Sequence, residues 1–375
     1  MIKSKLHILF LCGWYPSRVL PNNGDFIQRH AEAVNTLHKV SVLHIISDPS
    51  LHKNIEITSK SINGIYTHIA YIKHSKNPLL KIIRFCRAFG ILLKKIGHFD
   101  IVHLNKLYPF GIVALYLKLH KKKQYIISEH WTGYHMPLAK SISKTELLLS
   151  KYITKQATVI CPVSDNLKQS MQKLNLSGNY LKVPNVVNTD LFLPSKKTAN
   201  LFTIVHVSNM LDSHKNVSGI INTICELNKT TTDFQLILIG ENSLKYRVLA
   251  DKLKITHKVK FINHIPHLKV INYIQQADVF VLFSNYENLP CVILESFACG
   301  TPVISSNVGG ISEYFPNKFG FLIEPRNELQ LLNKLKYVYN YPKSNKEEMH
   351  KYAKENFSDM SIANQFSKLY EKALN

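Results

Sequence analysis

Residues 279–313 read VFVLFSNYENLPCVILESFACGTPVISSNVGGISE, and this order predicts a strand, a polar turn, a helix and a second strand. The run VFVLF is typical of a buried strand, and SNYENL is the polar turn after it. Pro290 suits the first position of a helix over 290–299, and Gly300 suits a left-handed cap at its end. A unit of this kind indicates a parallel sheet that is buried on both faces.

The same alternation of short apolar strands and helical patterns runs through the whole chain. It occurs twice, on either side of a Pro- and Asn-rich stretch at 183–194 that suits a linker. We therefore expect an α/β protein with two doubly wound domains, 1–187 and 188–356. The predicted strands are 8–11, 40–46, 101–104, 125–128, 159–163, 202–208, 234–239, 259–262, 279–283 and 302–305.

Composition agrees with two packed domains and argues against several other classes. The chain has 375 residues, 45% of them apolar, which is enough for two hydrophobic cores. Its six cysteines are scattered without CxxC spacing, as in a reducing compartment. No HExxH motif is present, and His264 and His267 lack neighbours of ligand type, so we expect no metal site. No run approaches the ~18 apolar residues of a membrane span, and the N-terminus is interpreted as a first strand rather than a signal peptide.

The charge is concentrated in the first half of the chain. Residues 1–187 hold 26 Lys and Arg against 8 Asp and Glu, a net of +18, whereas residues 188–375 hold 21 against 17, a net of +4. This imbalance favours a polyanionic partner such as an anionic bilayer or a nucleic acid, although a Lys-rich surface kept for solubility is the alternative.

A helix predicted at 78–96, PLLKIIRFCRAFGILLKKI, is basic on one side and apolar on the other. At 100° per residue its basic residues fall within an arc of about 140°. That pattern is typical of a helix lying in a membrane interface, and a helix packed on a sheet is an equal alternative. The basic residues are Lys81, Arg84, Arg87, Lys94 and Lys95.

Two carboxylates flank the start of the predicted helix 290–299. In a doubly wound sheet, ligands bind at the carboxyl ends of strands, and the free amides near Cys291 and Val292 would point at an anion such as a diphosphate. Glu287 precedes the helix, and Glu295 lies ~7.5 Å along its axis from Pro290. One carboxylate could bind a sugar and the other a ribose, or both could be ordinary turn and helix residues.

The stretch Glu287, seven residues, then Glu295, followed by ACGTPVI and GGISE, resembles the signature of family 4 retaining glycosyltransferases of the GT-B fold. The resemblance covers nearly the whole length, because 21–26, 159–164 and the linker also resemble family segments. It implies two Rossmann-like domains facing each other across a cleft. Residues 1–187 would bind the acceptor and 188–356 the donor, and a terminal helix at 357–374 would cross back onto the first domain.

The resemblance also implies roles for individual residues. Glu287 would meet the hydroxyls of the donor sugar, Glu295 those of the ribose, and Lys215 the diphosphate. Asn209 stands where the family usually has Arg, which leaves one fewer positive charge there. His130 matches a histidine near the transferred sugar, and its place after a predicted strand suits a ligand site. The remaining donor-binding positions are Gly24, Asn288, Leu289, Pro290 and Cys291.

The expected reaction is transfer of a hexose-type sugar from a UDP- or GDP-linked donor to a saccharide or lipid-linked acceptor. The resemblance suggests retention of configuration without an enzyme nucleophile. Neither cofactor nor metal is expected, because a Lys and helix amides can stabilise the departing diphosphate and no Asp-x-Asp motif ends a strand. The basic first half favours a peripheral protein on the cytoplasmic face of a bacterial cell membrane, in surface polysaccharide, lipopolysaccharide or glycolipid synthesis.

Three alternatives remain open from the sequence. One is a catalytically inactive interaction protein, which Asn209 in place of the usual Arg favours slightly. A sugar-nucleotide epimerase of the GT-B fold would share the nucleotide site, but it would need no acceptor and no basic first half. A nucleic-acid-binding protein would explain the net charge of +22. No helix-turn-helix, KH or RRM signature is present, however, so we expect no nucleic-acid partner.

Overall fold

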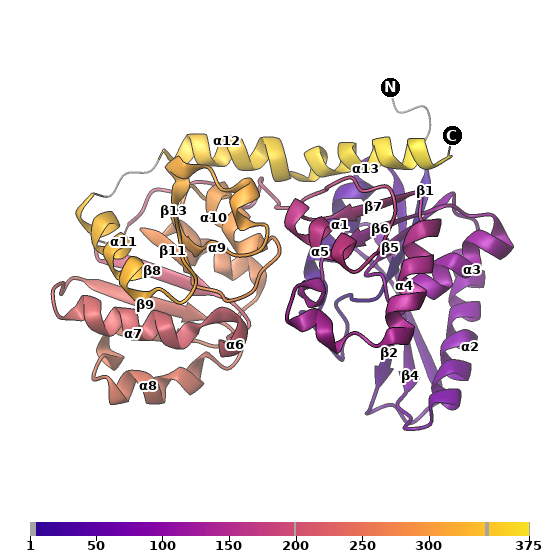
Figure 1. Cartoon of the computed structure of the whole chain (residues 1–375), viewed down its shortest axis with the longest axis horizontal. Helices are drawn as coiled ribbons and strands as arrows, with labels where there is room; N and C mark the ends of the chain where they lie inside the picture. Colours follow the sequence, from indigo (N-terminus) through magenta and orange to yellow (C-terminus); the bar gives the residue numbers. More distant parts are fainter. Residues whose placement is uncertain (1–4, 199, 342–344, 375) are drawn as a thin grey trace. The chain divides into compact units, whose positions relative to one another are not determined.

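The computed structural model describes residues 5–198, 200–341 and 345–374, which form two compact units (Figure 1). Within the described residues, the first unit runs to Val186 and takes in the C-terminal segment from Asp359, and the second is Val187–Ser358. Among the same residues no helix combines the length and the apolar character needed to cross a bilayer.

The first unit is built on a seven-stranded sheet in the order β3-β4-β2-β1-β5-β6-β7. All neighbours are parallel except β3 and β4, which pair antiparallel. Strands β5 and β6 are buried along their whole length and β1 in all but its first residue, as expected for a parallel sheet covered on both faces. The strands are β1 (His7–Cys12), β2 (Lys39–Asp48), β3 (Ile55–Ile62), β4 (Ile65–Lys73), β5 (Ile101–Asn105), β6 (Tyr125–Glu129) and β7 (Val159–Pro162).

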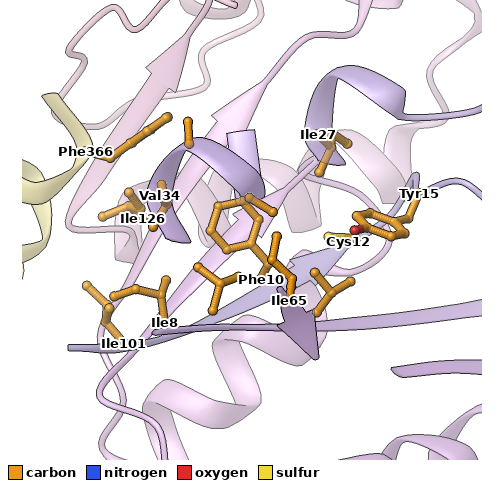
Figure 2. Close-up of a cluster of buried hydrophobic side chains, with 14 of the residues drawn as sticks. Ile8, Phe10, Cys12, Tyr15, Ile27, Val34, Ile65, Ile101, Ile126 and Phe366 are labelled. Atoms are coloured by element: carbon orange, nitrogen blue, oxygen red, sulfur yellow. The ribbon is translucent and has the colours of Figure 1, made fainter. Parts of the chain in front are cut away.

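Helices from both ends of the chain cover the core of the first unit. Figure 2 shows Phe10 of β1 among Val34 of α1 and Phe366 of α13, together with Ile8 and Ile65. The C-terminal helix is therefore part of this core although its sequence follows the second unit. The helices are α1 (Asp25–Asn35), α2 (Pro78–Ile96), α3 (Gly111–Lys121), α4 (Lys144–Gln156), α5 (Asp165–Lys173) and α13 (Asp359–Leu374), with 3₁₀ turns at Thr132–Tyr134 and Leu138–Ser141.

The second unit has a six-stranded, wholly parallel sheet in the order β10-β9-β8-β11-β12-β13. Its strands are β8 (Phe202–Val207), β9 (Phe234–Ile239), β10 (Val259–Ile262), β11 (Val279–Leu282), β12 (Val303–Ser306) and β13 (Gly320–Ile323). Its helices are α6 (Asp212–Lys215), α7 (Val217–Asn228), α8 (Arg247–Lys252), α9 (His267–Gln275), α10 (Cys291–Ala298), α11 (Glu328–Asn340) and α12 (Lys346–Phe357), with 3₁₀ turns at Ser243–Tyr246, Thr256–Lys258, Ile311–Tyr314 and Asn317–Phe319.

The predicted fold class is confirmed, and three local predictions need correction. All ten predicted strands are present, but β3, β4 and β13 were not predicted. Pro290 is not the first helical residue: its ψ of 122° is extended, so it is the N-cap and α10 begins one residue later. The terminal helix expected over 357–374 begins at Asp359, because Ser358 is extended and separates it from α12. Gly300 has the expected left-handed φ of 71°.

The stretch 183–194, predicted as a linker, has no helix or strand, but much of it is buried. Val183 and Val186 belong to the core of the first unit. Phe192 is buried in the second unit, where its ring lies 5.1 Å from that of His267. The stretch is therefore packed at these apolar positions, while Asp190, Leu191 and Leu193 are exposed.

Candidate functional site

The turn between β11 and α10, residues 283–290, lies at the carboxyl end of the second sheet. Backbone hydrogen bonds join it to the segments that follow the two neighbouring strands, β8 and β12. The amide of Asn285 donates to the carbonyl of His214, at 2.7 Å, in the segment after β8. The amide of Gly310, which follows β12, donates to the carbonyl of Asn288 at 2.9 Å. Three strand ends are thus joined at the edge where doubly wound sheets bind ligands.

Glu287 and Lys215 form an ion pair at this edge, although 72 residues separate them in the chain. Glu287 is only 8% exposed, and its Oε1 also accepts a hydrogen bond of 2.8 Å from the hydroxyl of Ser284. Lys215 is the last residue of α6. The predicted sugar-binding carboxylate and the predicted diphosphate-binding ammonium are therefore in contact, which the sequence did not indicate.

Glu295 lies on α10 and is 1% exposed, so it is not the solvated helix residue that the sequence left open. Its Oε1 is 2.9 Å from Nε2 of His267, the first residue of α9. His267 was expected to have no partner of ligand type, and that expectation is wrong. In the described part of the chain no group of three His, Cys, Asp or Glu side chains is placed to hold a metal ion.

A buried histidine fixes the segment after β8. Nδ1 of His206 is 2.8 Å from the carbonyl of Val281 and therefore donates to it, so Nε2 accepts from the hydroxyl of Ser208, also at 2.8 Å. The Ser208 oxygen in turn accepts the amide of Met210 at 3.0 Å. Burial lowers the pKa of His206 to about 4, so its imidazole is neutral at pH 7. This chain of bonds holds the loop that leads to α6 and Lys215.

The other predicted donor-binding residues of the second unit lie around this turn. Asn209 is exposed, and its side chain accepts a hydrogen bond of 3.2 Å from the amide two residues later. Asn288 and Leu289 are buried, whereas Pro290 and Cys291 are half-buried. Since α10 begins at Cys291, the amides of its first turn lie at the end of the turn that carries Glu287.

The two predicted residues of the first unit lie at the carboxyl end of its own sheet. Gly24 is the N-cap of α1 with φ of 79°, and a Cβ there would lie 2.7 Å from the carbonyl carbon of Trp14. The ring of His130 lies 4.6 Å from that of Phe26 and 5.3 Å from that of His30. Burial, with a smaller effect of neighbouring histidines, holds the pKa of His130 well below its ordinary value. His130 is thus a neutral ring.

Sequence reasoning missed Glu129, which lies beside His130 and is fully buried. Its carboxylate accepts hydrogen bonds from the amides of Leu107 (2.8 Å), His130 (2.8 Å) and Trp131 (3.0 Å), and from the hydroxyl of Tyr134 (3.3 Å). Burial raises its pKa, and the three amides, together with the charge of Lys106, act against that rise. The sequence signal that could have identified Glu129 was a carboxylate at the end of an apolar strand, since ligands bind at such strand ends.

Two family models match the chain in succession. The model described as "Glycosyltransferase Family 4" matches residues 26–191, and the model described as "Glycosyl transferases group 1" matches residues 192–356. Together they cover residues 26–356, which is most of both units.

Curated relatives are similar over part of their length. The chain is 24% identical over 220 residues to a subunit of phosphatidylinositol N-acetylglucosaminyltransferase from Arabidopsis thaliana. These 220 residues are 57% of this chain and 49% of that protein. It is 30% identical over 135 residues to glycogen synthase of Mycobacterium tuberculosis, 35% of this chain and 33% of that protein. The chain therefore spans half or less of these two relatives. It is 25% identical over 289 residues to a Campylobacter jejuni N-acetylgalactosaminyltransferase named for a diphospho-undecaprenol substrate. This alignment covers 70% of this chain and 74% of that protein.

Solved structures share the fold over almost the whole chain. Sucrose-phosphate synthase of Thermosynechococcus elongatus matches 98% of this chain and 99% of its own, with a TM-score of 0.79 and 20% identity. The Anabaena protein HepE in complex with UDP and glucose matches 98% and 99%, with a TM-score of 0.74 and 15% identity. The two family models match successive parts of the chain, and the two parallel sheets agree with them. The chain therefore belongs to the family 4 glycosyltransferases of the GT-B fold.

Proposed function

We propose that this protein transfers a hexose-type sugar from a nucleotide-sugar donor to a saccharide or lipid-linked acceptor, with retention of configuration. The observation that carries the proposal is the Lys215–Glu287 ion pair beside the first turn of α10. A cation and helix amides at one edge suit a diphosphate, and a carboxylate beside them suits sugar hydroxyls.

In this mechanism the second unit stabilises the leaving nucleoside diphosphate. Negative charge gathers on the diphosphate as its bond to the sugar breaks, so Lys215 and the α10 amides act most strongly in the transition state. Glu287 would accept hydroxyl hydrogens of a sugar whose ring carbon becomes positive. Glu295, held by His267, would bind the ribose, which stays unchanged. His130 would contribute a neutral ring near the transferred sugar.

The known proteins support a UDP-linked donor and a lipid-linked acceptor. The HepE structures contain UDP and UDP-glucose, and the Campylobacter jejuni relative is named for a saccharide on diphospho-undecaprenol. Both chemistries suit the proposed site, and a role in bacterial surface polysaccharide, lipopolysaccharide or glycolipid synthesis agrees with them. GDP-linked sugars remain in the proposal because the base-binding residues are not assigned.

Exposed apolar residues on α2 support peripheral attachment to the cytoplasmic face of an anionic membrane. Only Ala88, Phe89 and Leu92 of this helix are buried, while Leu79, Ile82 and Ile83 are 68%, 58% and 53% exposed. The apolar face predicted from the sequence is therefore largely uncovered in its first half, next to basic residues that complement anionic lipid. Exposed Ile112, Tyr116 and Leu119 on α3 extend it, and the rings of Phe89 and Tyr116 join the two helices at 6.3 Å.

A donor screen tests the proposed function. UDP-, GDP- and ADP-sugars are added in turn, and the midpoint temperature of thermal unfolding is measured with each. A ligand at 100 times its Kd stabilises the folded protein by about 2.7 kcal/mol, which raises that temperature. The stabilising donor is then incubated with and without a prenyl-diphosphate saccharide. We expect sugar transfer only with the acceptor. A donor converted to another nucleotide sugar without acceptor would identify an epimerase instead, and no stabilisation by any nucleotide sugar would contradict the proposal.

A further inference from the structure

Lys106 directly follows β5 and lies between the two tryptophans of the chain. Its Nζ is 4.0 Å from the ring centroid of Trp14 and 5.1 Å from that of Trp131. Across residues 5–198, 200–341 and 345–374, this ammonium is in no ion pair or hydrogen bond, so its polar contacts are the two indole faces. Burial lowers the pKa of Lys106, and the nearby carboxylate of Glu129 opposes that effect. Because Glu129 and Glu146 act on this half-buried ammonium without forming an ion pair with it, its Nζ can still pair directly with a phosphate.

The surrounding backbone is shaped to hold this group in place. Lys106 has φ of 72°, a left-handed conformation that non-glycine residues rarely adopt and that is concentrated at functional sites. Its amide donates to the carbonyl of Ser128 at 3.1 Å, which ties it to β6. The Trp131 ring rests on Gly133, where a Cβ would lie 2.2 Å from the indole. The cation and the ring are therefore fixed by neighbours rather than placed loosely on a surface.

The position in the sheet is one where ligands bind. β1 lies between β2 and β5, so the order of strands reverses there, and Trp14 and Lys106 follow the two strands β1 and β5. The cluster also reaches the predicted site residues of this unit. The ring of Phe26 lies 6.4 Å from that of Trp14 and 4.6 Å from that of His130.

We propose that Trp14, Lys106 and Trp131 form an acceptor subsite that binds a phosphorylated saccharide. Lys106 pairs with the phosphate, and the indoles cover the sugar while they keep water from the ion pair. This inference rests on the proposed function, since it names the acceptor of that reaction. The phosphate could belong to a soluble sugar phosphate or to a lipid-linked diphosphate, and the test separates these two sources.

Tryptophan fluorescence reads this site without a label, because Trp14 and Trp131 are the only tryptophans in the chain. The full-length protein is titrated with glucose, glucose 1-phosphate, UDP and N-acetylglucosamine diphosphate carried on a short water-soluble prenyl chain. We expect the tryptophan emission to change with one or both phosphorylated saccharides and not with glucose. A response to glucose 1-phosphate indicates a soluble acceptor, and a response to the prenyl compound alone indicates a lipid-linked one.

The variant Lys106→Met keeps an unbranched side chain, one atom shorter, and the same backbone constraint but removes the charge. We expect it to weaken the phosphosaccharide Kd about tenfold to a hundredfold, the range for a hydrogen bond to a charged partner. Lys334→Met is the matched control, because Lys334 is also half-buried and lies 4.5 Å over the ring of Phe321 in the second unit. It should bind as the parent does, and circular dichroism checks that both variants fold.

Three outcomes would overturn the inference: no response to either phosphosaccharide, equal affinity in Lys106→Met and the parent, or a response to UDP that is lost with Lys106. Binding of nucleotide sugars to the parent is measured separately by calorimetry. If the parent binds a nucleotide sugar but no phosphosaccharide, only this inference fails. If it binds no nucleotide sugar, the proposed function fails, whatever the fluorescence shows.

Discussion

At the scale of single residues, Glu287 carries the sharpest kinetic prediction. It should contact the sugar, where positive charge develops only as the bond to phosphate breaks, so its loss should lower kcat. We expect Glu287→Gln to reduce kcat about a hundredfold or more, for a loss of ~3 kcal/mol of electrostatic stabilisation. Donor kinetics measure this directly. Normal turnover of Glu287→Gln would show that the carboxylate has been misassigned.

Glu295 should behave differently because the ribose does not change during the reaction. An interaction that is equal in the ground and transition states sets KM rather than kcat. We expect Glu295→Gln to raise the donor KM and to weaken the binding of the free nucleoside diphosphate, with kcat nearly unchanged. Gln keeps the size of this buried side chain and an oxygen facing His267. Calorimetry with the nucleoside diphosphate measures the effect, Glu241→Gln is the exposed control in the same unit, and unchanged affinity in Glu295→Gln would refute the role.

The candidate site could be located from the sequence because its carboxylates share one short segment. Spacing alone placed Glu287 before a helix and Glu295 on it. The contact of Glu287 with Lys215 could not be predicted from spacing, since it joins the ends of two strands that become neighbours only when β8 and β11 pair. Lys106 was missed for the same reason: its two aromatic neighbours follow β1 and β6.

At the scale of elements, α13 is held to the first unit through buried histidines. The hydroxyl of Tyr370 lies 2.7 Å from Nδ1 of His103, and the hydroxyl of Ser367 lies 3.0 Å from Nε2 of His38. The ring of His30 lies 5.4 Å from that of Phe366. These histidines must stay neutral, because protonation would leave a charge in a buried core.

This arrangement predicts loss of stability in acid. Burial lowers the pKa of His30 to about 4 and holds that of His103 well below its ordinary value, so the folded state binds fewer protons than the unfolded state. The contribution of His30 is complete above the unfolded pKa of 6.5 and is lost as pH falls towards 4. We expect a loss of about 2 kcal/mol from His30 between pH 7 and pH 5. Urea unfolding of the parent and of His30→Gln at both pH values measures it.

In that experiment His30→Gln should be less sensitive to pH than the parent by the same amount. His257→Gln changes an exposed histidine of the second unit and should keep the pH dependence of the parent. Equal pH dependence in the parent and in His30→Gln would contradict the account of this buried ring.

The exposed half of α2 predicts binding to anionic vesicles. Each basic residue near an anionic surface contributes ~1 kcal/mol, so neutralising Lys81, Arg84, Arg87, Lys94 and Lys95 should abolish binding at moderate salt. Replacing Leu79, Ile82 and Ile83 by Ser should also weaken vesicle binding. The vesicle binding that this variant retains should still fall steeply as the salt concentration rises. Sedimentation with phosphatidylglycerol vesicles measures both. Neutralisation of Arg247, Lys252 and Lys254 in the second unit is the control, and vesicle binding that survives loss of the five α2 charges would exclude this helix.

Most of the strands that the sequence predicted are short apolar runs buried along most of their length. The missed hairpin β3–β4 shows why the others are harder: β3 is a partly exposed edge strand, IEITSKSI, whose polar residues hide the strand pattern. The sequence nevertheless contained a hairpin signal, the dipeptide Asn63-Gly64, which favours a two-residue turn. Both residues have the positive φ of such a turn, and they join β3 to β4. The helix α2 was predicted with its observed bounds because its apolar and basic faces have a clear helical period.

At the scale of the whole molecule, charge and chemistry are divided between the two units. Residues 1–187 carry +18, whereas the Lys215–Glu287 pair and Glu295 lie in the less charged second unit. A basic surface on one unit suits an anionic partner such as a membrane, and it does not require that the donor-binding unit be basic. This division favours a membrane-attached transferase over a nucleic-acid-binding protein, whose contacts would need a recognisable binding element.

The last prediction concerns metal. A departing nucleoside diphosphate needs positive charge, which many enzymes supply with Mg²⁺ held by carboxylates. In the proposed site Lys215 and the first amides of α10 would supply that charge, and no Asp-x-Asp motif follows a strand in the sequence. We therefore expect the rate of sugar transfer to be the same in excess EDTA as in added Mg²⁺. Lys215→Met should lose most activity under both conditions, since it removes a charge that stabilises the transition state. Complete loss of parent activity in EDTA, restored by Mg²⁺ or Mn²⁺, would show that a metal rather than Lys215 neutralises the diphosphate.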